Sequence, residues 1–227
     1  MCSRYFLDAD GNIIAYTFRV PVHEPIRKRF NIAPTQQAPV VRAAQDGGRE
    51  VAILRWGLVP PWAKDVAVGN RMINARSEGV DSKPAFRAAV RERRCLVPAS
   101  GFFEWKGAPG RKQPFAITLP DRPLFAFAGL WETWRSREGA SVETFTIVTT
   151  EANDAVAAIH DRMPVILPRE AEAAWLGGEP LEACKLLTPY SGTIALRAVS
   201  RVVSNVNNDA PECLDDAEAS WDQQELL

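Results

Sequence analysis

The sequence contains little of what several protein classes require. Of its 227 residues only 2 are histidines and 4 are cysteines, and no two cysteines form a CxxC pair. Their spacing indicates neither a disulfide framework nor a zinc site, and we expect no metal and no cofactor. No apolar run approaches the roughly 18–20 residues that span a membrane, and early charges leave no hydrophobic stretch for a secretory signal. We therefore expect a cytoplasmic protein with reduced thiols and no membrane partner.

Charge is balanced overall but not along the chain. There are 27 Lys and Arg residues against 28 Asp and Glu residues, and 46% of all residues are hydrophobic, which is typical of a globular protein. From Val202 onward there are seven acidic and no basic residues, so the first 201 residues carry a formal charge of +6. This excess is compatible with a polyanionic partner but does not require one. We expect residues 208–227 to be an acidic, partly disordered tail.

Segments with strand-like apolar patterns outnumber helical ones. The expected strands are residues 49–56, 94–105, 113–119, 123–134, 143–150 and 192–199. The expected helices are residues 82–93, 151–160 and 168–176. Strands in succession with helices scattered between them predict one α+β domain on a mostly antiparallel, curved sheet.

Cys2 becomes a nucleophile if Met1 is removed, which is common when a small residue follows. The terminus then carries an α-amine with a reference pKa of about 7.7–8.0 beside a thiol with one of about 8.5. The amine condenses with an aldehyde to an imine, and the thiol closes a five-membered thiazolidine that is harder to hydrolyse. The alternative is an inert cysteine at a frayed end, which its position alone favours.

Two further residues have side chains suited to moving protons. Glu104 alternates with Phe103 and Trp105 in an expected strand. It is either a solvent-facing carboxylate, which the local pattern favours, or a partly buried acid with a raised pKa. His160 ends an expected helix, where it is either a cap or a proton shuttle near neutral pH, and the pattern favours neither.

Two segments suit contact with a nucleic acid. The Pro-rich residues 56–62 present Trp62 for stacking on a base, which contributes roughly 1–3 kcal/mol, although burial is the commoner fate of tryptophan. Strand alternation points Asn74, Arg76 and Glu78 to one side. That arrangement suits either phosphate binding or a structural ion pair.

Taken together, these segments resemble the SOS-response-associated peptidase (SRAP) family, whose members crosslink themselves to abasic sites in single-stranded DNA. The resemblance runs in the family's order from residue 2 to about residue 207. With the cysteine at position 2, the ordered set is highly specific. The matching stretches are Met1-Cys2 with Arg4, residues 31–35, 56–62, 74–76 with Glu78, 95–105, 113–115, 147–149, 160–164, 203–204 and 206–207.

The resemblance implies a role for each matching residue. Cys2 would be the nucleophile, and Asn74, Glu104 and His160 would complete the catalytic site. The residues that would hold the DNA strand are Arg4, Asn31, Trp62, Arg76 and Thr149. Trp62 would act as a wedge against a continuous duplex. The implied fold is an α+β unit of residues 1–207 around a barrel-like antiparallel sheet, and we expect a monomer that joins the nucleoid when bound to DNA.

One position departs from the family pattern. The family reads Cys-Gly-Arg, whereas this chain has Cys2-Ser3-Arg4. Glycine takes backbone angles that are closed to serine, and it leaves room for DNA to approach. We therefore expect Ser3 to affect the rate and the geometry of the reaction rather than its chemistry.

Three functions remain open at this point. The first, which we rank highest, is covalent capture of an abasic site in single-stranded DNA by Cys2, with lyase-type activity. The second is a cysteine-type peptidase or autopeptidase with Cys2 as nucleophile, His160 as base and Glu104 as the orienting carboxylate. The third is a passive single-stranded nucleic-acid binder that uses the basic body and Trp62.

Overall fold

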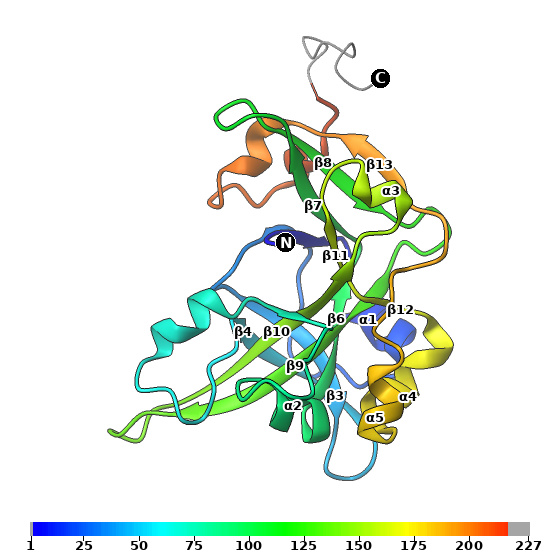
Figure 1. Ribbon diagram of the computed structural model, residues 1–227. Coiled ribbons are helices and arrows are strands. Elements are labelled where there is room, and N and C mark those ends of the chain that lie inside the picture. Colours follow the sequence, from blue (N-terminus) through cyan, green and yellow to red (C-terminus); the bar gives the residue numbers. More distant parts are fainter. Residues whose placement is uncertain (1, 218–227) are drawn as a thin grey trace.

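Figure 1 shows the computed structural model, which describes residues 2–217. Five antiparallel strands form the first sheet in the order β13, β8, β7, β1, β2. Their bounds are β1 Tyr5–Leu7, β2 Arg29–Ile32, β7 Gly101–Lys106, β8 Gln113–Thr118 and β13 Ala195–Ala198. The short strand β1 therefore lies between β7 and β2 and also contacts β6 of the second sheet.

The second sheet closes on itself. Its ring runs β4–β3–β6–β9–β10 and back to β4, and every pairing is antiparallel except that of β10 with β4. The ring strands are β3 Gln37–Ala43, β4 Arg49–Trp56, β6 Arg94–Ala99, β9 Phe125–Arg135 and β10 Ser141–Glu151. Three short strands extend it, namely β5 Asn74–Arg76, β11 Arg162–Pro164 and β12 Ile166–Leu167. The predicted α+β fold around a barrel-like, mostly antiparallel sheet is confirmed.

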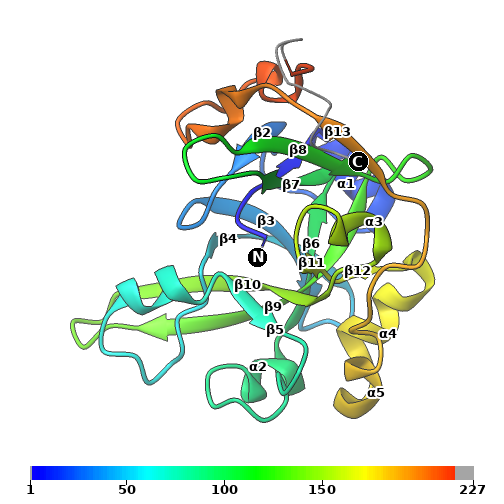
Figure 2. The ribbon, with the colours of Figure 1, turned by 45° about the horizontal axis from the view of Figure 1, so that its top comes forward.

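The helices are short and lie around the sheets (Figures 1 and 2). The α-helices are α1 Gly11–Phe18, α2 Arg87–Glu92, α3 Asp154–Ala157, α4 Glu172–Gly177 and α5 Pro180–Cys184. The 3₁₀ helices are η1 Val66–Arg71, η2 Arg169–Ala171, η3 Arg201–Ser204 and η4 Pro211–Leu214. Local capping sets some of these ends: the Asp10 side chain accepts the first amides of α1, and Arg19 ends it with φ of 51°.

The chain passes from the barrel to the first sheet at Ser100. Residues 94–105 were expected to form one strand, but β6 ends at Ala99 and β7 begins at Gly101. A Cβ atom on Gly101 would lie 2.4 Å from the Phe6 ring, so only glycine allows β1 to pack this closely. This crossing places β7, which carries Glu104, beside β1.

Large aromatic side chains fill the space between the two sheets. The ring of Tyr5 from β1 meets Trp56 edge-on at 5.3 Å and Phe127 at 6.0 Å. All three side chains are buried in one hydrophobic cluster that also includes Cys2. Aromatic pairs in these orientations add to the hydrophobic contribution of burial. The contacts of Tyr5 therefore hold β1, the strand that follows Cys2, in place.

The folded part of the chain continues past residue 207, the expected boundary. Helix η4 packs Cys213 into a small core with Phe6 and Phe103, and Asp216 bridges to Val199. Residues 208–217 are therefore part of the domain rather than a tail, because they bury apolar surface and pair with it. The rest of the expected tail, residues 218–227, lies outside the described residues.

No helix among the described residues is long and apolar enough to cross a membrane.

Candidate active site

Cys2 precedes strand β1, which begins at Tyr5, and is fully buried. Asn74 donates a hydrogen bond from Nδ2 to the Cys2 carbonyl at 2.7 Å, and the Cys2 Sγ lies 3.8 Å from the Arg4 carbonyl oxygen. Burial raises the pKa of the Cys2 thiol well above its usual range, and the charge of Glu104 raises it further. In the chain that begins at Met1, the thiol is therefore neutral and covered.

A pocket of about 380 Å³ lies beside this end of the chain. Its lining residues are Ser3, Arg4, Glu104, Trp105, Lys112, His160 and Ser204. They come from five separate parts of the sequence, and the pocket brings the predicted residues Glu104 and His160 together with the two residues that follow Cys2. Lys112, Ser204 and Trp105 were not predicted as site residues. Of these, Trp105 and Ser204 stand inside stretches that match the family, residues 95–105 and 203–204, whereas no sequence signal marked Lys112.

Glu104 is not solvent-facing, as its local pattern had favoured. Its side chain points inward from β7 and the residue is only 4% exposed. Burial raises its pKa to about 7, because an ionised carboxylate loses hydration in the interior. A carboxyl group with this pKa can give or take a proton near neutral pH.

His160 follows α3 and has two contacts at one ring nitrogen. Nδ1 accepts the Arg162 amide at 3.0 Å and lies 2.9 Å from Asp161 Oδ1. The first contact needs a lone pair on Nδ1, as in the neutral ring with its proton on Nε2, whereas the second needs a proton on Nδ1, so the two belong to different protonation forms of the ring. Burial lowers the pKa of His160, which favours the neutral ring with its proton on Nε2.

The turn that follows β5 and the start of β11, two residues after His160, are tied together by one ion pair. Arg162 binds Glu78 through two hydrogen bonds of 2.5 and 2.9 Å, and it also donates to the Thr149 carbonyl at 2.8 Å. This bidentate contact lowers the pKa of Glu78 to about 2. Of the two interpretations of this segment, the structural ion pair rather than phosphate binding is therefore confirmed for Glu78, and its partner is Arg162. Arg76 is exposed, and among the described residues no ion pair engages it.

The predicted DNA-binding residues differ in their exposure. Trp62 is 63% exposed, as the Pro-rich loop suggested. Arg4 is partly buried, and its guanidinium lies 5.6 Å from the centre of the Trp105 ring. Asn31 and Thr149 are both fully buried, so neither side chain is presented to a ligand in this structure. The Asn31 side chain bonds Arg4 and three backbone carbonyls instead.

Ser3 is one of the residues that line the pocket. Among the described residues other than glycine, only Arg19 and Thr35 have a positive φ, so the backbone at position 3 does not need glycine. The departure from the family pattern therefore places a serine at the pocket without backbone strain.

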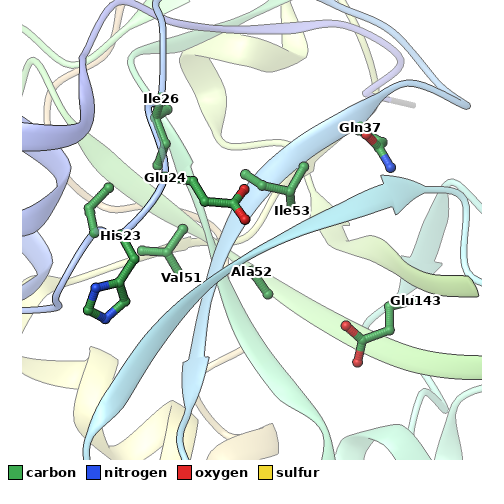
Figure 3. A pocket seen from close by; sticks show the side chains of 9 residues that line it. His23, Glu24, Ile26, Gln37, Val51, Ala52, Ile53 and Glu143 are labelled. Carbon is green, nitrogen blue, oxygen red and sulfur yellow. The ribbon is translucent and has the colours of Figure 1, made fainter.

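A second hollow, of about 570 Å³, holds the other histidine (Figure 3). His23 and Glu24 border it together with Val51, Ile53 and other residues of β3, β4 and β10. Its lining includes no cysteine, serine or lysine. Within residues 2–217, no three His, Cys, Asp or Glu side chains gather as a metal ion would require.

Comparison with known proteins shows which protein family this chain is related to. A model of the family described as SOS response associated peptidase (SRAP) matches residues 1–206. The abasic site processing protein YoqW of Bacillus subtilis is 40% identical over 224 residues, which cover 95% of this chain and 99% of that protein. The abasic site processing protein HMCES of Gallus gallus is 33% identical over 222 residues, covering 83% of this chain and 66% of that protein.

Solved structures agree with this relationship. A protein from Bacteroides thetaiotaomicron superimposes with a TM-score of 0.86 at 25% identity, over 95% of this chain and 100% of that one. A protein from Bordetella bronchiseptica gives a TM-score of 0.75 at 27% identity, over 88% of this chain and 100% of that one. The chain belongs to the SOS response associated peptidase (SRAP) family.

Proposed function

We propose that this protein processes abasic sites in single-stranded DNA by attaching itself covalently through Cys2. The observation that carries the proposal is the pocket that joins a buried acid with a pKa of about 7, Glu104, to His160 and to the chain next to Cys2. The names of the relatives YoqW and HMCES, both abasic site processing proteins, point to the same substrate.

The reaction needs an amine and a thiol on one residue. Removal of Met1 converts the Cys2 nitrogen from an amide into an amine. This amine attacks the C1′ aldehyde of the ring-opened sugar, and loss of water gives an imine. The thiol sulfur then bonds to C1′ while its proton passes to the nitrogen, and a thiazolidine results.

Glu104 and His160 would move the protons of these steps. Because the Cys2 thiol is neutral, its proton must leave as the C–S bond forms, and the Glu104 carboxylate is the base whose charge acts on that thiol. The protonated Glu104 would donate to the departing hydroxyl group. The neutral His160 ring, with its proton on Nε2, would relay protons at the amine. Asn74 would hold the Cys2 carbonyl in place through its 2.7 Å hydrogen bond.

The DNA strand would lie along the exposed cationic and aromatic groups. Arg76 and the guanidinium of Arg4 would contact phosphates, and Trp62 would stack on a base or separate a duplex. Affinity should then fall as salt rises, by a factor set by the number of phosphates contacted.

The decisive experiment is intact-mass analysis of Met1-free protein exposed to an abasic single-stranded oligonucleotide. We expect an adduct of protein plus oligonucleotide, minus water, that survives denaturation without a reductant. Cys2→Ala keeps the amine but lacks sulfur, so it should give a stable adduct only after borohydride reduction of the imine. An oligonucleotide with an intact base at the same position is the matched control. The proposal is wrong if Cys2→Ala forms a conjugate as stable as the parent's.

A cysteine-type autopeptidase with Cys2, His160 and Glu104 is the second candidate, favoured by the description of the matching family. Such an enzyme needs a thiolate nucleophile, whereas burial keeps the Cys2 thiol neutral. Repeated turnover of a peptide substrate would support this candidate over a single covalent capture.

A further inference from the structure

The acidic segment after residue 206, where the family match ends, makes a specific contact with strand β2. Asp209 Oδ1 accepts the backbone amides of Phe30 at 2.6 Å and Asn31 at 2.9 Å, while Oδ2 pairs with the Arg29 guanidinium. A carboxylate that receives two amides and a guanidinium is held in one orientation.

These contacts fall on an irregularity in β2. Tyr5 pairs with Ile32 and Leu7 pairs with Arg29, so two steps along β1 match three steps along β2. The extra residue is a β-bulge at Phe30–Asn31, a device that redirects a side chain next to a functional site. Asp209 receives both amides of this bulge and therefore stabilises it.

The bulge aims Asn31 at the inner end of Arg4. The fully buried Asn31 donates Nδ2 to the carbonyls of Val203, Asn205 and Asn208 at 3.1, 3.0 and 2.6 Å. Its Oδ1 accepts Arg4 Nη1 at 2.8 Å, and the same nitrogen donates to the Val203 carbonyl at 2.9 Å.

Arg4 consequently uses both Nη1 protons within the protein. Within residues 2–217 no hydrogen bond engages its Nε and Nη2, and this edge of a guanidinium binds a phosphate through two parallel hydrogen bonds. Arg4 lines the pocket beside Trp105, whose indole donates to Ser204 Oγ at 3.2 Å. The turn that carries Ser204 is thus held by the same network.

We propose that Asp209 is a positioning residue for DNA binding: through the bulge and Asn31, it orients Arg4 and the Trp105–Ser204 pair toward a phosphate of the bound strand. The inference rests on the proposed function, because it names how that site would hold its DNA.

The test measures affinity for an intact-base single-stranded oligonucleotide together with crosslinking of its abasic counterpart. Asp209→Ala should weaken binding about tenfold, as expected for loss of one oriented charged contact. It should also reduce the slope of log affinity against log salt by about 0.7, the contribution of one phosphate. With DNA below saturation, crosslinking of the abasic strand should fall in the same proportion, because less of the strand is bound.

Asp216→Ala is the matched control. Asp216 lies in the same segment and pairs with Arg197 at 2.6 Å, with its side chain 82% exposed and no bond to Asn31. The Asp216→Ala substitution removes one negative charge, as Asp209→Ala does, and should leave the affinity for single-stranded DNA within twofold of that of the parent. In an Arg4→Met background, Asp209→Ala should cause no further loss if Asp209 acts through Arg4.

The geometry itself has a readout that does not depend on crosslinking. The indole N–H resonance of Trp105, assigned with Trp105→Phe, should shift in Asp209→Ala and stay in place in Asp216→Ala. If Asp209→Ala does not fold, Asp209→Asn, which keeps an acceptor but loses the ion pair, should show the same changes at smaller size.

Equal affinities of the Asp209 and Asp216 variants, an undiminished loss in the Arg4→Met background, or an unmoved Trp105 resonance would overturn the inference. A parent protein that binds DNA but forms no adduct would instead contradict the proposed function alone.

Discussion

Burial at single residues decides which groups of the site can exchange protons near neutral pH. Glu104 and Cys2 are both covered, yet burial brings the pKa of the carboxyl group up to about 7 and moves that of the thiol further from neutrality. The difference follows from their ordinary values, since desolvation raises both. The carboxyl group, rather than the thiol, is therefore the group that titrates in the physiological range.

Glu104→Gln should change how stability depends on pH. The folded protein holds the Glu104 proton up to a pKa of about 7, whereas the unfolded chain releases it near the ordinary value of 4.5. Below pH 4.5 both states are protonated and the group contributes fully, and this contribution is lost as pH rises toward 7. Relative to Glu104→Gln, the parent should therefore lose about 3 kcal/mol of unfolding free energy between pH 4.5 and 7.5. Urea titrations at several pH values measure this, and a constant difference would contradict the assigned burial.

At the scale of elements, the site depends on two connections that cross between strands. The start of β11, which follows His160, is tied to the turn after β5 by the Glu78–Arg162 pair. The passage from β6 to β7 depends on the missing side chain of Gly101. Each holds one catalytic candidate, His160 or Glu104, against the N-terminal strand. Both connections can be weakened without touching the pocket.

Glu78→Gln should slow crosslinking several-fold by loosening the turn that holds His160. The pKa of Glu78 is about 2, so the effect should be the same from pH 5 to pH 8. Glu78 is 53% exposed at its side chain, and solvent screening limits the stability cost to roughly 1 kcal/mol. Glu182→Gln, which breaks an exposed pair with Lys185 at 2.7 Å, is the control and should leave the rate unchanged. A rate equal to that of the control would show that the pair does not position His160.

Gly101→Ala should destabilise the protein by about 2–4 kcal/mol, because its Cβ would lie 2.4 Å from the Phe6 ring and 2.7 Å from the Ile117 carbonyl. Thermal unfolding measures the loss. Gly177→Ala is the comparison, since nothing lies within 4 Å of its Cβ, and it should be neutral. Adding Phe6→Leu should restore part of the stability only if the ring is what the new methyl group meets. Equal stability of the two alanine variants would refute the close approach.

How far the sequence predicts these elements depends on the range of the forces involved. Alternation located β4, β8, β9 and β10 to within about two residues, because apolar periodicity is local. The break at Ser100 was missed because it arises from Phe6, almost a hundred residues away. Helix α2 was expected from residue 82 but begins at Arg87, after a series of turns around Pro84, whose missing amide favours a turn. Glu104 was assigned to solvent because nothing local reveals the sheet that covers it.

At the scale of the whole molecule, the site exists only where the two sheets meet. The first sheet supplies Glu104 and the strand after Cys2, whereas the barrel supplies Asn74 on β5 and the turn before β11 (Figure 2). The family resemblance predicted this set of residues, but single-chain patterns gave no distances between them. The family resemblance also could not predict that the Asn31 side chain is buried, because its three carbonyl partners come from the folded C-terminal segment.

Charge along the whole chain should control how fast DNA is found. Ending the chain at Ala217 removes Glu218, Asp222 and Glu225 and no basic residue, which changes the formal net charge from −1 to +2. Because association with a polyanion follows the field of the whole protein, this variant should bind single-stranded DNA about twofold faster at low salt. The gain should vanish near 0.5 M salt, where screening acts over only about 4 Å. Stopped-flow association measures both. The full-length chain with amides at these three positions should match the shortened one, because only charge differs; if it matches the parent instead, the segment acts through contacts rather than through the field.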